Sequence, residues 1–185
     1  MTIPNLLSLL RMGLVPFFLI AVFEGEPRRA LWIFLVAGVT DALDGAIARL
    51  WKQQSLLGSY LDPIADKLLL TSAYVGLSIP SLHHGTPIPV WVTVLVIARD
   101  VLLVSVALVL YLAQGVKRFP PSVLSKVTTV FQVAAVAVVL LSGLLHDLEP
   151  VVLGMVYLVA GLTLASGLDY VWRVHRRLVG ERDKG

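Results

Sequence analysis

Long apolar stretches, separated by short polar or proline-containing breaks, run along almost the whole chain. A helix needs roughly 20 predominantly apolar residues to cross a bilayer, and about six stretches approach that length. They extend from about Leu6 to Phe23, Ala30 to Trp51, Leu57 to Ile79, Val90 to Leu112, Ser122 to Leu145 and Val151 to Trp172. The pattern therefore predicts an all-α integral membrane protein with about six transmembrane helices.

The first residues of the chain allow two interpretations. Ile3, Pro4 and Asn5 are typical of a helix start, because proline is favoured in the first helical turn. From Asn5 to Arg11, leucines alternate with Ser8 and Arg11, which fits a short amphipathic helix at the membrane interface. The same residues also fit the frayed beginning of the first transmembrane helix, so we keep both possibilities.

Composition agrees with a membrane protein. The chain has 185 residues, of which 57% are hydrophobic and 15% charged, and its mean hydropathy is +0.86. Soluble domains are less apolar and more highly charged. The sequence contains no cysteine, which excludes disulfides and thiolate metal sites. We expect one membrane domain over residues 1–173, a basic cytoplasmic tail over residues 174–185, and no cleavable signal peptide.

Lysine and arginine are distributed unevenly between the predicted loops. If both ends of the chain lie inside, the inner side carries Arg49, Lys52, Lys117, Arg118, Arg173, Arg176, Arg177, Arg182 and Lys184. The outer loops then carry only Arg28 and Arg29. Because positive residues concentrate in cytoplasmic loops, we predict that both termini are cytoplasmic.

Four carboxylates stand inside two of the apolar stretches at regular spacing. They belong to the pattern D-x-x-D-G-x-x-A-R, which is followed after eight residues by G-x-x-x-D-x-x-x-D. The fixed positions are Asp41, Asp44, Gly45, Ala48, Arg49, Gly58, Asp62 and Asp66. A charged carboxylate inside a membrane is costly unless a cation compensates it. The pattern therefore indicates a functional site, which the predicted topology places on the cytoplasmic side.

Helical spacing predicts that these carboxylates gather around one cleft. Residues three or four apart share a helix face, which puts the two aspartates of each half of the pattern side by side. Such oxygen ligands suit hard divalent cations, and four of them can hold two ions for phosphoryl transfer. Two other interpretations stay open at this point. The aspartates could neutralise Arg49 and Lys67, or they could form an ion relay in a transporter.

The complete pattern resembles, without a departure, the signature of the CDP-alcohol phosphatidyltransferase family. Three other segments resemble the CMP-forming cardiolipin synthases and phosphatidylglycerophosphate synthases of that family. They are Pro4–Arg11, Ala98–Asp100 and Ser125–Gln132. The resemblance thus extends over most of the chain, up to about Trp172.

The resemblance implies a reaction and a set of residues for it. A phosphatidyl group would pass from CDP-diacylglycerol to an acceptor hydroxyl, with release of CMP. The implied ligands of two divalent cations, Mg²⁺ or Mn²⁺, are Asp41, Asp44, Asp62 and Asp66. Asp66 would also be the general base. The implied donor-binding residues are Asn5, Gly45, Ala48, Arg49 and Gly58.

The acceptor depends on a different part of the chain. Arg99 and Lys126 are cations in or beside predicted helices, and we expect them to bind an acceptor phosphate. For Arg99 the alternative is an ion pair with Asp100 or Asp169. Residues 125–129 read S-K-V-T-T, which lacks the glycine and second lysine of the G-K-x-K-T segment of phosphatidylglycerophosphate synthases. The segment is closer to S-K-x-N-T, so it favours phosphatidylglycerol as acceptor, with glycerol 3-phosphate as the alternative.

Other protein classes fit the sequence less well. UbiA-type prenyltransferases also use intramembrane aspartates, but they lack the D-G-x-x-A-R core. A small transporter or scaffold is the non-enzymatic alternative. The resemblance further implies a homodimer in the lipid bilayer, and we expect no nucleic-acid partner.

Overall fold

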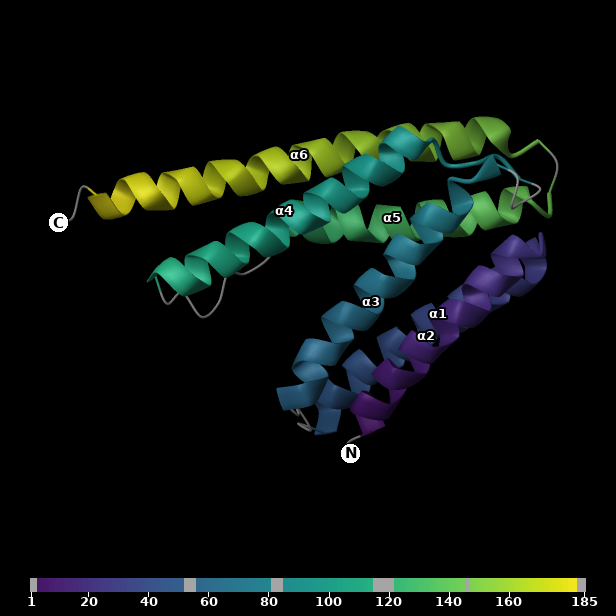
Figure 1. Cartoon of the computed structure of the whole chain (residues 1–185), viewed down its shortest axis with the longest axis horizontal. Coiled ribbons are helices and arrows are strands. Elements are labelled where there is room, and N and C mark those ends of the chain that lie inside the picture. The colour runs from purple at the N-terminus through teal and green to yellow at the C-terminus, as the bar shows by residue number, and fades with distance from the viewer. Residues whose placement is uncertain (1–2, 52–55, 81–84, 115–121, 146, 183–185) are drawn as a thin grey trace. The chain divides into compact units, whose positions relative to one another are not determined.

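The computed structural model describes residues 3–51, 56–80, 85–114, 122–145 and 147–182. Within these ranges it describes the side chains except those of residues 3–5, 42–51, 56–63, 107, 110–111, 113–114 and 177–182. The helices are α1 (Ile3–Phe23), α2 (Pro27–Trp51), α3 (Leu56–Leu77), α4 (Val90–Gln114), α5 (Val123–Ser142) and α6 (Glu149–Arg182) (Figure 1). No strand occurs in the described ranges, so the predicted all-α fold is confirmed there.

Each predicted apolar stretch corresponds to one helix, and the helix ends differ from the predicted bounds most notably in α1 and α6. The helix α1 runs without a break from Ile3 to Phe23, so residues 5–11 belong to its first turns, and their position at the membrane interface stays a prediction. The helix α6 continues past Trp172 to Arg182. Residues 173–182 contain several arginines, which favour a helix, and no proline that would end it. The predicted boundary at residue 173 therefore lies inside a continuous helix.

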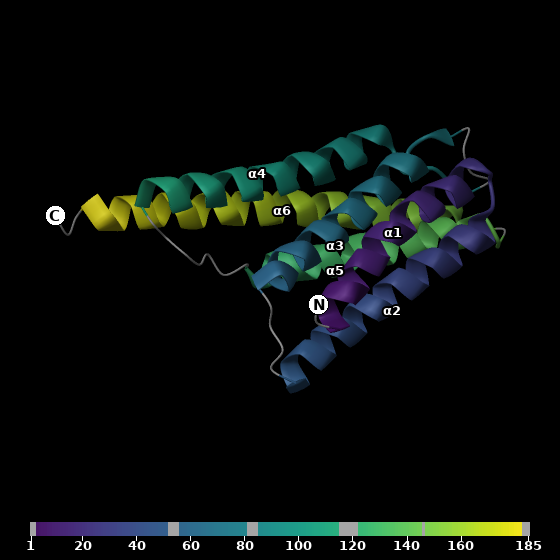
Figure 2. The same cartoon turned by 60° about the horizontal axis from the view of Figure 1, so that its bottom comes forward.

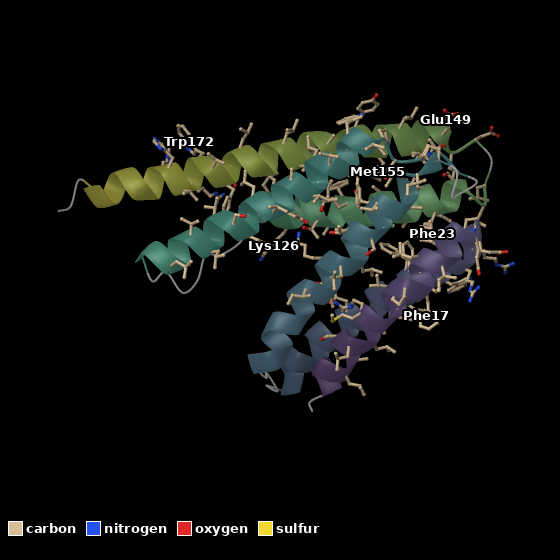
Figure 3. The ribbon with its side chains drawn as sticks, in the orientation of Figure 1. Phe17, Phe23, Lys126, Glu149, Met155 and Trp172 are labelled. Carbon is tan, nitrogen blue, oxygen red and sulfur yellow. The ribbon has the colours of Figure 1, made fainter. Side chains whose placement is uncertain are left out.

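Three of the helices are long and apolar enough to cross a bilayer, judged by length and composition of the described residues. These segments are Leu6–Phe23, Val123–Ser142 and Glu149–Arg176. Large apolar side chains on these helices are exposed, such as Phe17 and Phe23 of α1, which are 55% and 52% exposed (Figure 3). Apolar helices with exposed apolar side chains are typical of a membrane protein. Six membrane crossings remain a prediction.

The chain forms two compact units, of which the first comprises Met1–Val90 and Val136–Val152. In this unit α1 packs against both α2 and α3, and it runs alongside α2 in both ribbon views (Figure 2). Ala21, Ala37 and Ala73, one on each of these helices, are fully buried. Small residues let helix backbones approach closely in a membrane, where lipid provides no hydrophobic drive for association. The packing therefore brings the polar residues of α1 close to the two helices that carry the aspartates.

One turn of this unit leaves no room for a side chain. Gly143 follows α5 and lies against Pro27, and a Cβ atom at residue 143 would be 2.8 Å from the Pro27 Cβ. We therefore expect Gly143→Ala to destabilise the protein by about 1–3 kcal/mol through overpacking. The measurement is the melting temperature of purified protein in detergent.

The matched control for this prediction is Gly13→Ala in α1. A Cβ atom at residue 13 would meet no described atom within 4 Å. Alanine is also the better helix former, so this control should keep or raise the melting temperature. Equal losses in the two variants would contradict the packing around Gly143.

The second unit comprises Trp91–Ala135 and Leu153–Gly185, and polar contacts connect its helices. Thr128 of α5 donates a hydrogen bond to a carbonyl oxygen of α6 at 3.2 Å, and Gln132 donates one to Thr163 at 3.4 Å. Tyr170 of α6 donates a hydrogen bond to a carbonyl oxygen of α4 at 3.3 Å. Hydrogen bonds of this kind stabilise contacts between helices in a membrane.

Candidate functional site

Two of the predicted metal ligands meet at one buried arginine. The Arg11 Nη1 atom of α1 lies 2.7 Å from the Asp41 Oδ1 atom of α2. The same nitrogen donates a hydrogen bond to the Asp66 Oδ1 atom of α3. Three helices therefore contribute one charged group each to the same place. Asp41 and Asp66 are far apart in the sequence, and Arg11 of α1 contacts both of them.

Exposure differs sharply between the arginine and its two partners. The Arg11 side chain is 1% exposed, whereas those of Asp41 and Asp66 are 45% and 48% exposed. A buried arginine that lost its partners would be an uncompensated charge, which destabilises a protein strongly. Arg11 thus lies on the interior side of the carboxylates, while about half of each carboxylate side chain remains accessible from outside.

These two carboxylates fit a divalent cation. Their oxygens are hard ligands, they come from two different helices, and they are accessible to an ion and to substrate phosphate. Asp44 and Asp62 belong to the same helices, but their side chains lie outside the described part of the structure. Among the described side chains, no three His, Asp or Glu residues form a group that could hold a metal. The structure therefore brings two of the four predicted ligands together, and the complete site with four carboxylates remains a prediction.

The predicted donor-binding residues occupy the same three helices. Asn5 is in α1, residues Gly45, Ala48 and Arg49 are in α2, and Gly58 is in α3. Their side-chain surroundings lie outside the described part of the chain, so their contacts with a donor remain predictions.

Arg11 was not predicted as a site residue. The sequence suggested Arg49 and Lys67 as cations for the aspartates, and the structure adds Arg11 as a counter-cation. A signal was present, since Arg11 is the only charged residue of the apolar stretch from Leu6 to Phe23. A charged residue in such a stretch needs a partner in the protein interior. Its partners could not be read from the sequence, because they lie 30 and 55 residues further along the chain.

Arg99, predicted to bind the acceptor phosphate, connects three helices of the second unit. Its Nη1 atom donates a hydrogen bond to the Asp100 Oδ1 atom at 2.8 Å, which is the ion pair given above as the alternative to phosphate binding. Its Nη2 atom donates hydrogen bonds to the hydroxyl oxygens of Ser125 in α5 and Ser166 in α6, both at 2.6 Å. The Arg99 guanidinium is therefore held in a fixed place between α4, α5 and α6.

The other predicted residues of this region differ from Arg99 in their surroundings. Asp169, the alternative partner for Arg99, pairs with Arg173 four residues along α6, with 3.0 Å between nitrogen and oxygen. Lys126 projects from α5, next to Ser125, and its side chain is exposed (Figure 3). Phosphate binding remains a prediction for both Arg99 and Lys126.

Comparison with known proteins gives a consistent result along most of the chain. The family model described as CDP-alcohol phosphatidyltransferase matches residues 1–166. The chain is 35% identical to the human protein named cardiolipin synthase (CMP-forming), over 96% of the chain and 63% of that relative. It is 39% identical to a probable phosphatidylglycerophosphate synthase of Mycobacterium tuberculosis, over 96% of the chain and 84% of the relative.

A third relative comes from Shigella flexneri and is named CDP-diacylglycerol–glycerol-3-phosphate 3-phosphatidyltransferase. It is 36% identical, over 91% of the chain and 92% of its own length. The chain spans only 63% of the length of the human and rat cardiolipin synthases that it matches. Relatives with both kinds of name match at similar identity, so identity alone does not choose between the two acceptors.

Proposed function

Because the chain belongs to the CDP-alcohol phosphatidyltransferase family, we propose that it transfers the phosphatidyl group of CDP-diacylglycerol to a glycerol-type acceptor hydroxyl. The observation that carries this proposal is the convergence of Asp41 and Asp66, from two helices, at one accessible point. Both aspartates belong to the pattern that resembles the family signature, and both are exposed enough to meet a substrate.

Divalent cations are part of this proposal. The family is generally dependent on divalent metals. Asp41, Asp44, Asp62 and Asp66 would hold two Mg²⁺ or Mn²⁺ ions, as the chemistry of carboxylate oxygens favours. When bound, such ions neutralise phosphate charge and align the attacking and leaving oxygens.

Asp66 would act as the general base. It accepts the proton of the acceptor hydroxyl while the hydroxyl oxygen bonds to the phosphorus next to diacylglycerol. The bond from that phosphorus to the oxygen bridging to the cytidine side breaks, and CMP leaves with this oxygen. The half-exposed Asp66 carboxylate supports this role, because an acceptor hydroxyl can reach it.

The other residues of the pattern would hold the donor. Gly45, Ala48 and Gly58 would give the nucleotide room to approach the helix backbones, and Arg49 would bind the donor diphosphate, as the family resemblance implies. Asn5 would contribute from α1, whose Arg11 already lies beside the two aspartates. We also propose six membrane crossings, cytoplasmic termini, a cytoplasmic active site and a homodimer, since the loop charges and the family resemblance support them.

The proposed acceptor is phosphatidylglycerol, which would make the product cardiolipin. The segment S-K-V-T-T at residues 125–129 supports this choice, because it carries one lysine where phosphatidylglycerophosphate synthases carry two. Phosphatidylglycerol has one negative charge, whereas glycerol 3-phosphate is close to a dianion, so fewer cations suffice for the former. Ser125 contacts Arg99 at 2.6 Å, which ties this segment to the other proposed phosphate ligand. Glycerol 3-phosphate is the alternative acceptor.

An assay that offers each acceptor separately tests this choice. Purified protein would be mixed with CDP-diacylglycerol, Mn²⁺ and either phosphatidylglycerol or glycerol 3-phosphate, and the lipid products identified by mass spectrometry. We expect cardiolipin from phosphatidylglycerol. Product formed only from glycerol 3-phosphate would reverse the assignment of the acceptor while keeping the reaction class.

The role of Lys126 leads to a separate prediction. We expect Lys126→Gln to raise the KM for the acceptor about tenfold or more, since a hydrogen bond to a charged group contributes about 1.5–3 kcal/mol. The KM for CDP-diacylglycerol and the melting temperature should change little, because the Lys126 side chain is exposed. Steady-state kinetics with each substrate varied in turn measures both constants.

The control for Lys126 is Arg176→Gln. Arg176 is an exposed cation of α6 that lies 5.1 Å from the centre of the Trp172 ring. Its loss should leave the acceptor KM unchanged. An equal rise in KM for both variants would show a general effect of surface charge and would contradict a specific role of Lys126.

A further inference from the structure

Arg11 is a buried cation to which the proposed reaction assigns no role. It is the most deeply buried of the charged side chains that the structure describes, at 1% exposure. It belongs to α1, whereas the aspartate pattern belongs to α2 and α3. The inference below rests on the proposed function, because it concerns the same carboxylates.

One guanidinium nitrogen serves both carboxylates. Arg11 Nη1 contacts the Oδ1 atoms of Asp41 and Asp66, so the positive charge lies between two negative ones. Like charges that share a site repel each other, and removal of a buried counter-charge leaves that repulsion uncompensated. Arg11 thus permits two carboxylates from different helices to lie close together without a metal.

A divalent cation and Arg11 would be attracted to the same two carboxylates. Arg11 occupies the interior side, and the carboxylates are about half exposed, so an ion can approach them from the accessible side. We propose that Arg11 is a positioning residue of the metal site, which holds Asp41 and Asp66 together before divalent cations bind and then competes with those cations for the two carboxylates.

The proposal differs from a purely structural role in what it predicts about metal. If Arg11 only anchored α1, its replacement would destabilise the protein equally with and without metal. If Arg11 also competes with cations, its replacement destabilises the metal-free protein most, and the metal binds more tightly than in wild type. Ligand binding to the folded state raises stability by an amount that grows with affinity. Tighter Mn²⁺ binding should therefore appear as a larger Mn²⁺-induced rise in melting temperature.

The experiment uses the full-length protein in detergent, stripped of metal with a chelator that is then removed. Wild type is compared with Arg11→Gln, Arg11→Lys and the control Arg29→Gln. Arg29 is also an ion-paired arginine, 3.1 Å from Glu24, but it is 56% exposed. Two quantities are measured: the melting temperature with and without Mn²⁺, and the Mn²⁺ dissociation constant from the electron paramagnetic resonance signal of free Mn²⁺.

We expect Arg11→Gln to lower the melting temperature of the metal-free protein and to show a larger Mn²⁺-induced rise than wild type. Its Mn²⁺ dissociation constant should fall about tenfold, because a positive charge a few ångströms from the ion is removed. Arg11→Lys keeps the charge, so its dissociation constant should stay within about threefold of wild type. Arg29→Gln should behave as wild type, since exposed ion pairs contribute little.

An unchanged or higher Mn²⁺ dissociation constant in Arg11→Gln would overturn the proposal, and so would an equal loss of melting temperature with and without Mn²⁺. If Arg11→Gln does not fold with or without Mn²⁺, the test of competition rests on Arg11→Lys. A tenfold fall of the Mn²⁺ dissociation constant in Arg11→Lys, which keeps the charge, would contradict competition by charge. Failure of wild type itself to bind Mn²⁺ would overturn the metal site of the proposed function as well. Wild-type binding with no effect of Arg11 would overturn only the role of Arg11.

Discussion

Replacement of Asp66 by asparagine is expected to lower kcat for CMP release by a factor of about 100 or more. Asparagine has nearly the same shape and can still accept a hydrogen bond from Arg11, but it cannot take a proton from the acceptor hydroxyl. General base catalysis contributes about 10²–10⁴-fold to a rate, which sets the expected loss. The measurement is the initial rate of CMP release from CDP-diacylglycerol at saturating phosphatidylglycerol and Mn²⁺.

A matched control makes this result specific to the site. Asp147→Asn is the matched control, because Asp147 is exposed, follows α5, and has a positive φ of 70° that asparagine also adopts readily. Its kcat should equal that of wild type. If Asp66→Asn left CMP release intact, Asp66 would not be the base, and the proton would have to go to another group.

Removal of divalent cations is expected to have the largest effect. In the presence of a chelator, CMP release should fall by about 1,000-fold or to background, because bound cations contribute several kcal/mol of charge stabilisation and each 1.36 kcal/mol is a factor of ten. Addition of Mg²⁺ or Mn²⁺ in excess over the chelator should restore the rate. The helical circular dichroism signal should stay the same throughout, since Arg11 keeps Asp41 and Asp66 together without metal.

Undiminished CMP release in the chelator would contradict a catalytic metal. The aspartates would then act only as partners of cations such as Arg11. Loss of activity together with loss of helical signal would instead show that the metal holds the fold, which would contradict the positioning role given to Arg11. The control is the chelator already saturated with Mg²⁺, which should have no effect.

The helices could be predicted from the sequence because their pattern is strongly apolar. Every predicted stretch became a helix, with ends that moved by a few residues. The largest difference is in α6, which continues to Arg182 although the apolar stretch stops near Trp172. Hydropathy shows where a helix can leave the membrane. The helix itself continues until the backbone changes conformation or a capping group satisfies its last carbonyl oxygens.

The site could be predicted less completely. The structure brings Asp41 and Asp66 together from two helices, while the shared helix faces of the two aspartates in each half of the pattern stay a prediction. Local spacing could not indicate Arg11, since its contacts depend on how α1 packs against α2 and α3. The same limit applies to Arg99, for which the neighbour Asp100 was predicted but Ser125 and Ser166 were not. Contacts between distant segments follow from tertiary packing, which a sequence pattern does not contain.

Arg11 and Arg99 are both cations inside apolar helices, and their charges are compensated in different ways. Among the described residues, Arg11 contacts the accessible carboxylates of Asp41 and Asp66, whereas Arg99 contacts the Asp100 carboxylate and the hydroxyl groups of Ser125 and Ser166. The contacts of Arg11 with Asp41 and Asp66 support its place at the proposed metal site, whereas acceptor binding by Arg99 stays a prediction.

We propose above all that this protein transfers a phosphatidyl group from CDP-diacylglycerol. The most direct test of this transfer is to follow the nucleotide and the lipid product together, with purified protein, Mn²⁺ and phosphatidylglycerol. We expect CMP and cardiolipin in equal amounts, with neither formed when phosphatidylglycerol is omitted. Release of CDP in place of CMP, or no nucleotide release with either phosphatidylglycerol or glycerol 3-phosphate, would contradict it.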